Sequence, residues 1–250
     1  MNSGREKAIN LPGVIVVLIG VFALIHLWRG SLSPASDADV LARFAFVPGR
    51  LTFAFDPEAV TAALNELLRS DMQGARVARF FLGDGSPHWS SVATYSFLHG
   101  DWMHLGFNAL WLAAFGSAVA RRFGTSRFLA FGLLAALAGA LAHWLAHRLD
   151  LQPVIGASAI VSGAMAAAAR FAFSGGVDTR ALSFAEMTRN RAAVNFLGIW
   201  FVTNFLFGVA GPAMGLSDSP IAWEAHIGGF LAGLFCFGWF DQVHTTSAPQ

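Results

Sequence analysis

The sequence predicts an all-α membrane protein with six transmembrane helices and a long loop after the first of them. Apolar side chains make up 55% of the 250 residues and charged ones only 12%, about half of the ~25% found in soluble domains. The apolar residues also gather in six segments, and each is long enough to cross ~30 Å of hydrocarbon as a helix. These segments are Leu11–Trp28, Phe97–Ala120, Phe128–Ala146, Val154–Phe173, Ala192–Ala210 and Ile221–Phe240.

The first segment, residues 11–28, is interpreted as a retained transmembrane anchor. A cleaved signal peptide would end in a small-x-small pattern, and none directly follows Trp28. Five more apolar segments also come after it.

Residues 29–96 are predicted to form a long loop that contains an amphipathic helix. The Asp-Pro-Glu sequence at positions 56–58 is typical of a helix start, and apolar residues then repeat at the spacing of one helical face. Such a face suits lipid and the helical bundle equally, so its partner stays open. The stretch Phe44–Phe55, interrupted by a Pro-Gly pair, is predicted to be a hairpin. The apolar face consists of Val60, Ala63, Leu64, Leu67 and Leu68.

The basic residues predict the orientation of the chain. Basic residues are enriched in cytoplasmic loops, and the short loops on one side contain only Arg148. We therefore expect both tails, residues 1–10 and 241–250, in the cytoplasm and residues 29–96 on the opposite side. Residues 97–240 then form a five-helix core, and a bacterial inner membrane is the expected location. The basic residues on the cytoplasmic side are Arg5, Lys7, Arg121, Arg122, Arg127, Arg170, Arg180, Arg189 and Arg191.

Charge and cysteine content exclude several classes of protein. The net charge of +1 leaves no basic face for nucleic acid. The single cysteine, Cys236, excludes a disulfide scaffold. The expected partners are therefore the lipid bilayer and other membrane proteins, and the sequence assigns no oligomeric state.

Polar residues inside the apolar segments cost free energy in lipid, so their presence there indicates function. The second segment contains His104 and Asn108, which share a helical face. The fourth contains Ser158 and the sixth His226. His104, Ser158 and His226 each lie a few residues inside the same predicted membrane edge, at a depth of roughly 7–10 Å. We therefore expect them to converge on one water-accessible cavity.

Such a cavity supports nucleophilic attack. A serine hydroxyl needs a neighbouring base, and histidine is suited to that task near neutral pH, so Ser158 is the candidate nucleophile and His226 the candidate base. The backbone N–H of Ser158 and the side chains of His104 and Asn108 are candidate donors to the oxyanion. No acidic third member is evident, because Glu224 is two residues from His226 and should point elsewhere. Substrate-binding residues are not assigned.

Purely structural roles for these polar residues remain open. A serine in a membrane helix commonly bonds back to its own backbone, and His104 with Asn108 would also serve as a structural clasp to the first loop. His143 and His147 are four residues apart, but no carboxylate or cysteine accompanies them and the motif lacks the glutamate of His-Glu-x-x-His. They are interpreted as interfacial, and no metal site is predicted.

Three motifs resemble those of the rhomboid family of intramembrane serine proteases. They are His99-Gly100-Asp101-Trp102-Met103-His104 leading to Asn108, then Gly156-Ala157-Ser158, then Ala225-His226-Ile227-Gly228-Gly229. The resemblance implies a rhomboid-like six-helix bundle with a Ser158–His226 dyad and with His104 and Asn108 as oxyanion donors. It also implies cleavage of single-span transmembrane substrates without a metal or cofactor. The chain differs at Ala159, where the family usually has glycine.

The sequence is thus interpreted as that of a rhomboid-type serine endopeptidase that acts within the membrane. Two alternatives belong to other classes. One is a catalytically inactive rhomboid-like protein that binds membrane clients. The other is a haem or quinone protein that uses His104, His143 and His226.

Overall fold

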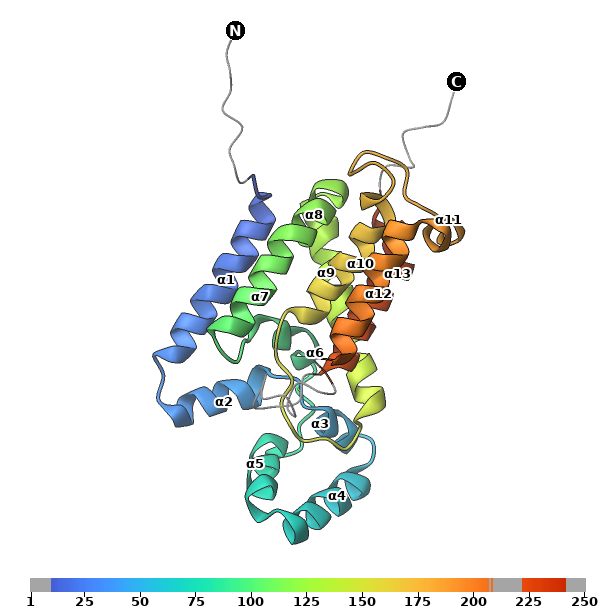
Figure 1. The fold of residues 1–250 in the computed structure, drawn as a ribbon. Coiled ribbons are helices and arrows are strands. Elements are labelled where there is room, and N and C mark those ends of the chain that lie inside the picture. The colour runs from blue at the N-terminus through green and yellow to red at the C-terminus, as the bar shows by residue number, and fades with distance from the viewer. Residues whose placement is uncertain (1–9, 207, 209–221, 242–250) are drawn as a thin grey trace.

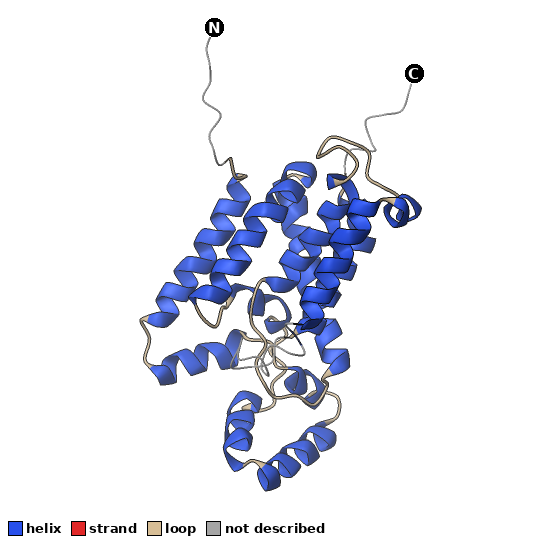
Figure 2. Ribbon diagram, in the orientation of Figure 1, coloured by secondary structure: helices blue, strands red, loops and turns tan. Residues whose placement is uncertain are grey.

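The computed structural model describes residues 10–206, 208 and 222–241, and within these ranges the chain is built from helices (Figure 2). The only pairing between extended segments there is an antiparallel bridge between Phe46 and Val154. The predicted all-α class is therefore confirmed. The tails 1–9 and 242–250 lie outside the described residues, as do Ala210 and Ile221 at the edges of two predicted segments.

Within the described residues, three helices are long and apolar enough to cross a membrane. The first is α1, Gly13–Gly30. The second runs over Trp102–Phe123 and consists of α7 (Trp102–Trp111), a π-helical turn (Leu112–Gly116) and α8 (Ser117–Phe123). The third is α9, Thr125–Ala146. Each lies within a few residues of a predicted apolar segment.

The remaining bundle helices are shorter. They are α10 (Ser158–Ala172), α12 (Arg191–Phe205) and α13 (Trp223–Phe235), which the short α14 (Phe237–Phe240) follows. All of them lie alongside the long helices in one bundle (Figure 1). The short α11 (Phe184–Arg189) comes between α10 and α12 in the chain and lies at the edge of this bundle (Figure 1).

The fourth helix begins later than the sequence predicts. Val154 pairs with Phe46 instead of entering a helix, and Gly156 has a φ of +123°, a conformation that only glycine adopts at low cost. The expectation of a helix from Val154 is therefore wrong by one turn, because these residues pair with the first loop. The chain returns from the end of α9 toward the middle of the bundle before α10 starts (Figure 1).

Glycines let α13 pack directly against α10 and α9. A Cβ at Gly229 would overlap the carbonyl oxygen of Ala159, and a Cβ at Gly233 would overlap that of Gly163. Both pairs are 70 residues apart in sequence, so α10 and α13 run parallel in a fixed register. Such close approach of backbones is the usual role of small residues in membrane helices.

The first loop folds into helices of its own. They are α2 (Pro34–Phe44), α3 (Pro48–Phe53), α4 (Pro57–Ser70), α5 (Met72–Leu82) and α6 (Ser91–Thr94), and a 3-10 turn over Tyr95–Phe97 follows them. The predicted amphipathic helix is α4, and Asp56 caps it by accepting a hydrogen bond from the N–H of Ala59 at 3.0 Å. The predicted hairpin is wrong, because Pro48 starts a helix, where a proline has no N–H to lose.

The apolar face of α4 packs on protein. Val60 is fully buried and clusters with Ala78 and Leu82 of α5 and with Leu151. Arg50 of α3 is also buried and connects the loop helices, since its guanidinium donates to the carbonyl oxygens of Ala42, at 2.6 Å, and of Phe81. The sequence left open whether this apolar face contacts lipid or protein, and Val60 contacts protein.

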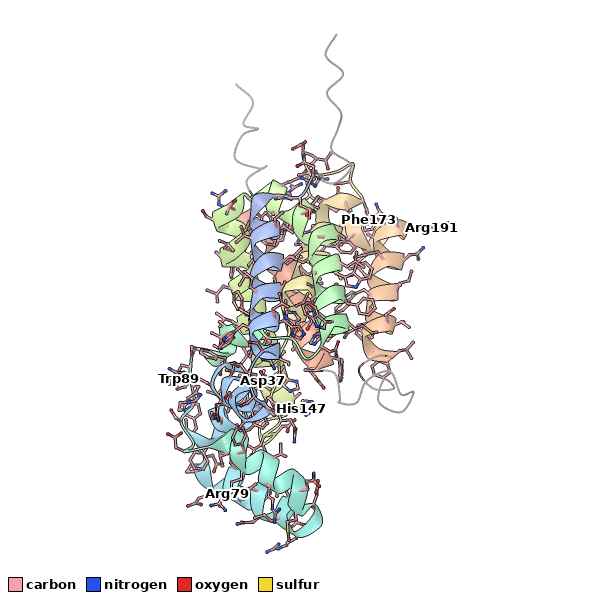
Figure 3. All side chains as sticks on the ribbon, turned by 90° about the vertical axis from the view of Figure 1, so that its left-hand side faces the viewer. Asp37, Arg79, Trp89, His147, Phe173 and Arg191 are labelled. Carbon is pink, nitrogen blue, oxygen red and sulfur yellow. The ribbon has the colours of Figure 1, made fainter. Side chains whose placement is uncertain are left out.

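Both described ends of the chain lie at the same end of the bundle. Arg121 of α8 donates to the carbonyl oxygen of Asn10, and the neighbouring Arg122 pairs with Asp241 at 2.8 Å. Phe173 and Arg191 lie at this end, whereas His147 lies at the other end, beside the first loop (Figure 3). The first loop and the described ends of the chain, Asn10 and Asp241, therefore occupy opposite ends of the bundle.

A capping box closes the start of α11 at the same end of the bundle as Asn10 and Asp241 (Figure 1). The hydroxyl of Ser183 accepts from the N–H of Glu186, and the carboxylate of Glu186 accepts from the N–H of Ser183 at 2.7 Å. A hydrogen bond from Arg180, followed by that backbone N–H, lowers the pKa of Glu186 to about 2. The box therefore keeps its charge throughout the physiological pH range.

Candidate active site

Ser158 is the first residue of α10, and the start of this helix has no side-chain cap. The first helical hydrogen bond runs from the N–H of Val161 to the carbonyl oxygen of Ala157 at 3.0 Å. The N–H groups of Ser158, Ala159 and Ile160 therefore have no partner within the helix. Among the described residues, the hydroxyl of Ser158 makes no hydrogen bond to the helix backbone. The alternative in which this serine bonds back to its own helix is therefore not observed there.

The start of α10 lies well inside the bundle. A Cβ at Gly139 of α9 would lie 2.6 Å from the Cβ of Ala159 and 2.9 Å from the carbonyl oxygen of Ala225. Gly139 is seven residues before the end of α9 at Ala146, which corresponds to about 10 Å along the helix. Ser158 and His226, which adjoin Ala159 and Ala225, are therefore at a similar depth.

His226 lies in the first turn of α13, and its ring is held from α12. Its Nδ1 atom lies 2.6 Å from Oδ1 of Asn204, and Nδ2 of Asn204 donates to the carbonyl oxygen of Trp223 at 3.5 Å. A backbone carbonyl only accepts, so the amide nitrogen faces Trp223 and the amide oxygen faces the imidazole. Nδ1 of His226 therefore carries the hydrogen, and Nε2 has a free lone pair.

The register between α10 and α13 brings His226 close to the level of Ser158. Because residue 159 of α10 lies beside residue 229 of α13, Ser158 is level with residue 228, two positions from His226. This offset is about 3 Å along the axis. Close small-residue packing leaves little space between these two helices at that level.

His104 lies in the first turn of α7 and approaches the loop before Ser158. Its Nδ1 atom accepts a hydrogen bond from the N–H of Gly100 at 3.4 Å, so Nε2 carries the hydrogen. Nε2 lies 2.7 Å from the position that a Cβ on Gly156 would take, and Oγ of Ser158 lies 3.8 Å from the same point. Gly156 therefore separates the His104 donor from the Ser158 hydroxyl, and its missing side chain leaves that space open.

Asn108 is one turn along α7 from His104 and is 5% exposed. Its amide nitrogen donates to the carbonyl oxygen of His104 at 2.9 Å. This bond joins Asn108 to its own helix, not to the first loop, and leaves the second amide hydrogen available. Asn108 therefore supports the backbone that carries His104.

The three predicted polar positions are helix starts and not points within longer helices. Ser158 is the first residue of α10, His104 the third of α7 and His226 the fourth of α13. The sequence estimate of depth assumed helical residues before them, and that assumption is wrong because extended segments precede α7 and α10. The loop before α10 connects two of these positions, because His104 approaches Gly156, which is two residues before Ser158.

Glu224 contacts two histidines that the sequence analysis left without a carboxylate. Its oxygens lie 3.2 Å from Nδ1 of His143 and 2.8 Å from Nε2 of His147. Glu224 thus points away from the bond between His226 and Asn204, as expected. The expectation that no carboxylate accompanies His143 and His147 is wrong, because α13 brings Glu224 to the end of α9.

A family model, the rhomboid domain, matches residues 86–241 of this chain, which is more than half of its length. The chain belongs to the rhomboid family. With three helices apolar enough to span a bilayer, this rhomboid is an integral membrane protein. The matched range contains all four predicted site residues.

Two curated relatives are similar to this rhomboid. Rhomboid protease GluP of Bacillus subtilis is 31% identical over 147 residues, which are 59% of this chain and 25% of that protein. Rhomboid protein 1, mitochondrial, of Saccharomyces cerevisiae is 29% identical over 157 residues, which are 60% of this chain and 41% of that protein. The chain thus matches about a quarter and about two-fifths of the lengths of these relatives.

The sequence analysis of this rhomboid missed Asn204. It is an amide within the fifth predicted apolar segment, so the rule that selected the other polar residues would also have selected it. Nothing in the sequence, however, indicates that α12 turns Asn204 toward His226 rather than toward lipid.

Proposed function

We propose that this rhomboid is an intramembrane serine endopeptidase in which Ser158 is the nucleophile and His226 the general base. The opposite tautomers of two histidines carry the proposal. Asn204 fixes the hydrogen of His226 on Nδ1, which leaves Nε2 as a base. The N–H of Gly100 fixes the hydrogen of His104 on Nε2, which makes it a donor. A base and an oxyanion donor need these two states.

In the proposed first step, Nε2 of His226 accepts the proton of the Ser158 hydroxyl while Oγ attacks the carbonyl carbon of the substrate peptide. The carbonyl oxygen becomes an oxyanion. The free N–H groups at the start of α10 and Nε2–H of His104 are its donors, and the positive end of the helix dipole adds to their effect. Asn108 holds the His104 backbone in place and has one amide hydrogen left for the same task.

In the second step, the imidazolium of His226 donates its proton to the leaving amine, and the peptide bond breaks to give an acyl-enzyme. A water molecule then attacks the ester, His226 accepts the proton of that water, and Ser158 regains its hydroxyl. No metal or cofactor takes part in these steps.

The proposed substrates are single-span transmembrane proteins. Three free backbone N–H groups and three polar side chains about 10 Å inside the end of α9 require water or a ligand at that depth. The rhomboid family and the name of the Bacillus subtilis relative, a rhomboid protease, are consistent with proteolysis at such a site. A substrate helix would have to unwind locally to present its peptide bond to Ser158.

We further propose six membrane spans, formed by α1, the α7–α8 helix, α9, α10, α12 and α13, in a bacterial inner membrane. An even number of crossings agrees with the position of Asn10 and Asp241 at one end of the bundle. Arg121, Arg122 and Arg191 lie at that end, and a concentration of arginine is typical of the cytoplasmic face. The active site then opens toward the opposite, non-cytoplasmic side.

The test is cleavage of a tagged single-span membrane protein in liposomes by three forms of the full chain. The native chain and Ser162→Ala should cleave it, because Ser162 lies one turn further along α10. Ser158→Ala should fall to background, since loss of a catalytic serine costs on the order of 10⁶-fold in kcat.

Labelling with a serine-directed phosphonate gives a second measurement that needs no substrate. Ser158 should be labelled in the native chain and not in His226→Ala. Equal cleavage by the native chain and Ser158→Ala would refute the proposal. A native chain that neither cleaves nor reacts would favour an inactive, client-binding rhomboid.

A further inference from the structure

A cluster of metal-ligand side chains lies at the first-loop end of the bundle, and the proposed proteolysis does not use it. We infer that His143, His147 and Glu224 form a binding site for a divalent transition-metal ion of the zinc type. His143 and His147 come from the last turn and the C-cap of α9, and Glu224 from the first turn of α13.

The positions of the ligand atoms support this inference. One nitrogen of each histidine and one carboxylate oxygen lie within 4.8 Å of one another. Nδ1 of His143 and Nε2 of His147 each lie beside a different oxygen of Glu224, at 3.2 Å and 2.8 Å. In a tetrahedral zinc site with bonds of about 2.0–2.1 Å, neighbouring ligand atoms are about 3.4 Å apart. The three side chains therefore need only small adjustments to close around an ion.

The type of ligand indicates the type of ion. Two imidazoles and one carboxylate form a ligand set that suits zinc and similar transition metals, whereas calcium and magnesium prefer oxygen ligands alone. Three protein ligands leave a fourth position for water or a small anion. That position is accessible, because the His147 side chain is 42% exposed while those of Glu224 and His143 are 16% and 7% exposed.

Two features restrain the ligands before any ion binds. The histidines are four residues apart near the end of one helix, so their rings lie on one face, with centroids 4.8 Å apart. Gly228 also packs against Ala138 and Ala142 of α9, and this contact fixes the first turn of α13 at the end of α9. The ligand that comes from the second helix is therefore held near the other two.

A bound ion would connect the end of α9 to the start of α13. Glu224 lies two residues before His226 in the same helix, so the ion would also steady the turn that carries the proposed base. The site contains none of the residues assigned to proteolysis, so metal binding is expected whether or not the chain cleaves substrates.

The test is titration of the purified full chain with Zn²⁺, carried out in detergent, without a histidine tag and in competition with a chromogenic chelator. All forms carry Cys236→Ser, because a thiol is also a zinc ligand. The reference chain should bind one Zn²⁺. His147→Ala and Glu224→Gln should each weaken binding by more than the ~10–100-fold that loss of a supporting group around a metal site costs.

Two further variants separate ligation from general effects. Asp150→Asn removes a carboxylate that also interacts electrostatically with His143 but lies outside the cluster, and it should change the affinity by less than about threefold. His147→Cys replaces one zinc ligand by another and should restore binding.

Thermal unfolding gives a readout that does not depend on the chelator. Zn²⁺ should raise the Tm of the reference chain, because an ion that binds only the folded state stabilises it, and should leave the Tm of Glu224→Gln unchanged. Absence of saturable binding by the reference chain would overturn the inference. Zn²⁺ binding by His147→Ala and Glu224→Gln that is as tight as binding by the reference chain would overturn it as well.

Discussion

Exchange of a single methyl group between α9 and α10 tests the packing that holds the candidate site together. Where the rhomboid family usually has glycine after the nucleophile, this chain has Ala159, and the facing residue on α9 is Gly139. The Cβ of Ala159 occupies the space that a side chain on Gly139 would need. The two positions are therefore predicted to be coupled, so that a methyl group on one excludes a methyl group on the other.

The magnitude follows from the distances at this contact. In Gly139→Ala, the new Cβ would lie 2.6 Å from the Cβ of Ala159 and 2.9 Å from both the carbonyl oxygen of Ala225 and the hydroxyl of Tyr95. Normal carbon contacts are about 3.5–4.0 Å, so three groups on different segments must move. Overpacking costs about 1–3 kcal/mol, and we expect the upper end of this range.

The reverse substitution and the double substitution complete a cycle. Ala159→Gly should lower the free energy of unfolding by about 1–2 kcal/mol, because it removes one buried methyl group and places glycine in a helix. In the double variant, the clash between the two Cβ atoms disappears while the contacts with Ala225 and Tyr95 remain. The double variant should therefore be about 1 kcal/mol more stable than the sum of the single changes predicts.

The measurement is equilibrium unfolding of all four forms in one detergent, together with substrate cleavage. Because Ala159 and Ala225 adjoin Ser158 and His226, Gly139→Ala should also reduce cleavage, and Ala159→Gly in the same chain should restore part of it. Strict additivity of the unfolding free energies would refute the reasoning, since it would mean that the two residues do not touch.

Two further predictions concern single side chains. Asn204→Leu should lower kcat by about 10-fold with little change in KM, since it removes a hydrogen bond worth about 0.5–1.5 kcal/mol that fixes the His226 tautomer. Asn204→Asp keeps the acceptor oxygen and should retain more activity. Equal losses of kcat in both variants would contradict a positioning role. Arg122→Met should lower the free energy of unfolding by about 1.5–3 kcal/mol, the contribution of hydrogen bonds to a charged group. The Asp241 carboxylate loses its bidentate contact with Arg122, and the carbonyl oxygens of Val177 and Thr179 lose a donor. Denaturant unfolding checks the second prediction, and a change below about 1 kcal/mol would contradict it.

The apolar segments predict most of the fold because the thickness of the bilayer sets the length of a membrane helix. The sequence places α1 and α9 to within a few residues. The prediction is wrong at Val154. This apolar residue is predicted to lie in a helix, but it forms a β-bridge with Phe46 of the first loop. That partner is more than 100 residues away in sequence, so no local pattern contains the information.

The candidate site was predictable in its residue types and not in its connections. Ser158, His104 and His226 stand out because polar groups are rare in apolar segments. The contact of His226 with Asn204 and that of Glu224 with His143 and His147 depend on the rotation of α12 and α13 about their axes. Helices that are apolar on all sides carry no stripe to fix that rotation, so only the packing of glycines such as Gly229 determines it.

The late start of α10 explains how Ser158, the proposed nucleophile, is placed inside a membrane protein. Had the helix begun at Val154, as the sequence predicts, its free N–H groups would lie at the edge of the bundle, and Ser158 would be one turn inside, with its N–H bonded within the helix. Because Gly156 turns the chain with a φ of +123°, the helix starts about 10 Å inside the end of α9. Free N–H groups at that depth cost several kcal/mol each unless water or a ligand satisfies them. By shortening the helix, Gly156 therefore leaves unpaired N–H groups at the depth where the proposed mechanism needs oxyanion donors, and these groups need the same polar surroundings as the proposed hydrolysis.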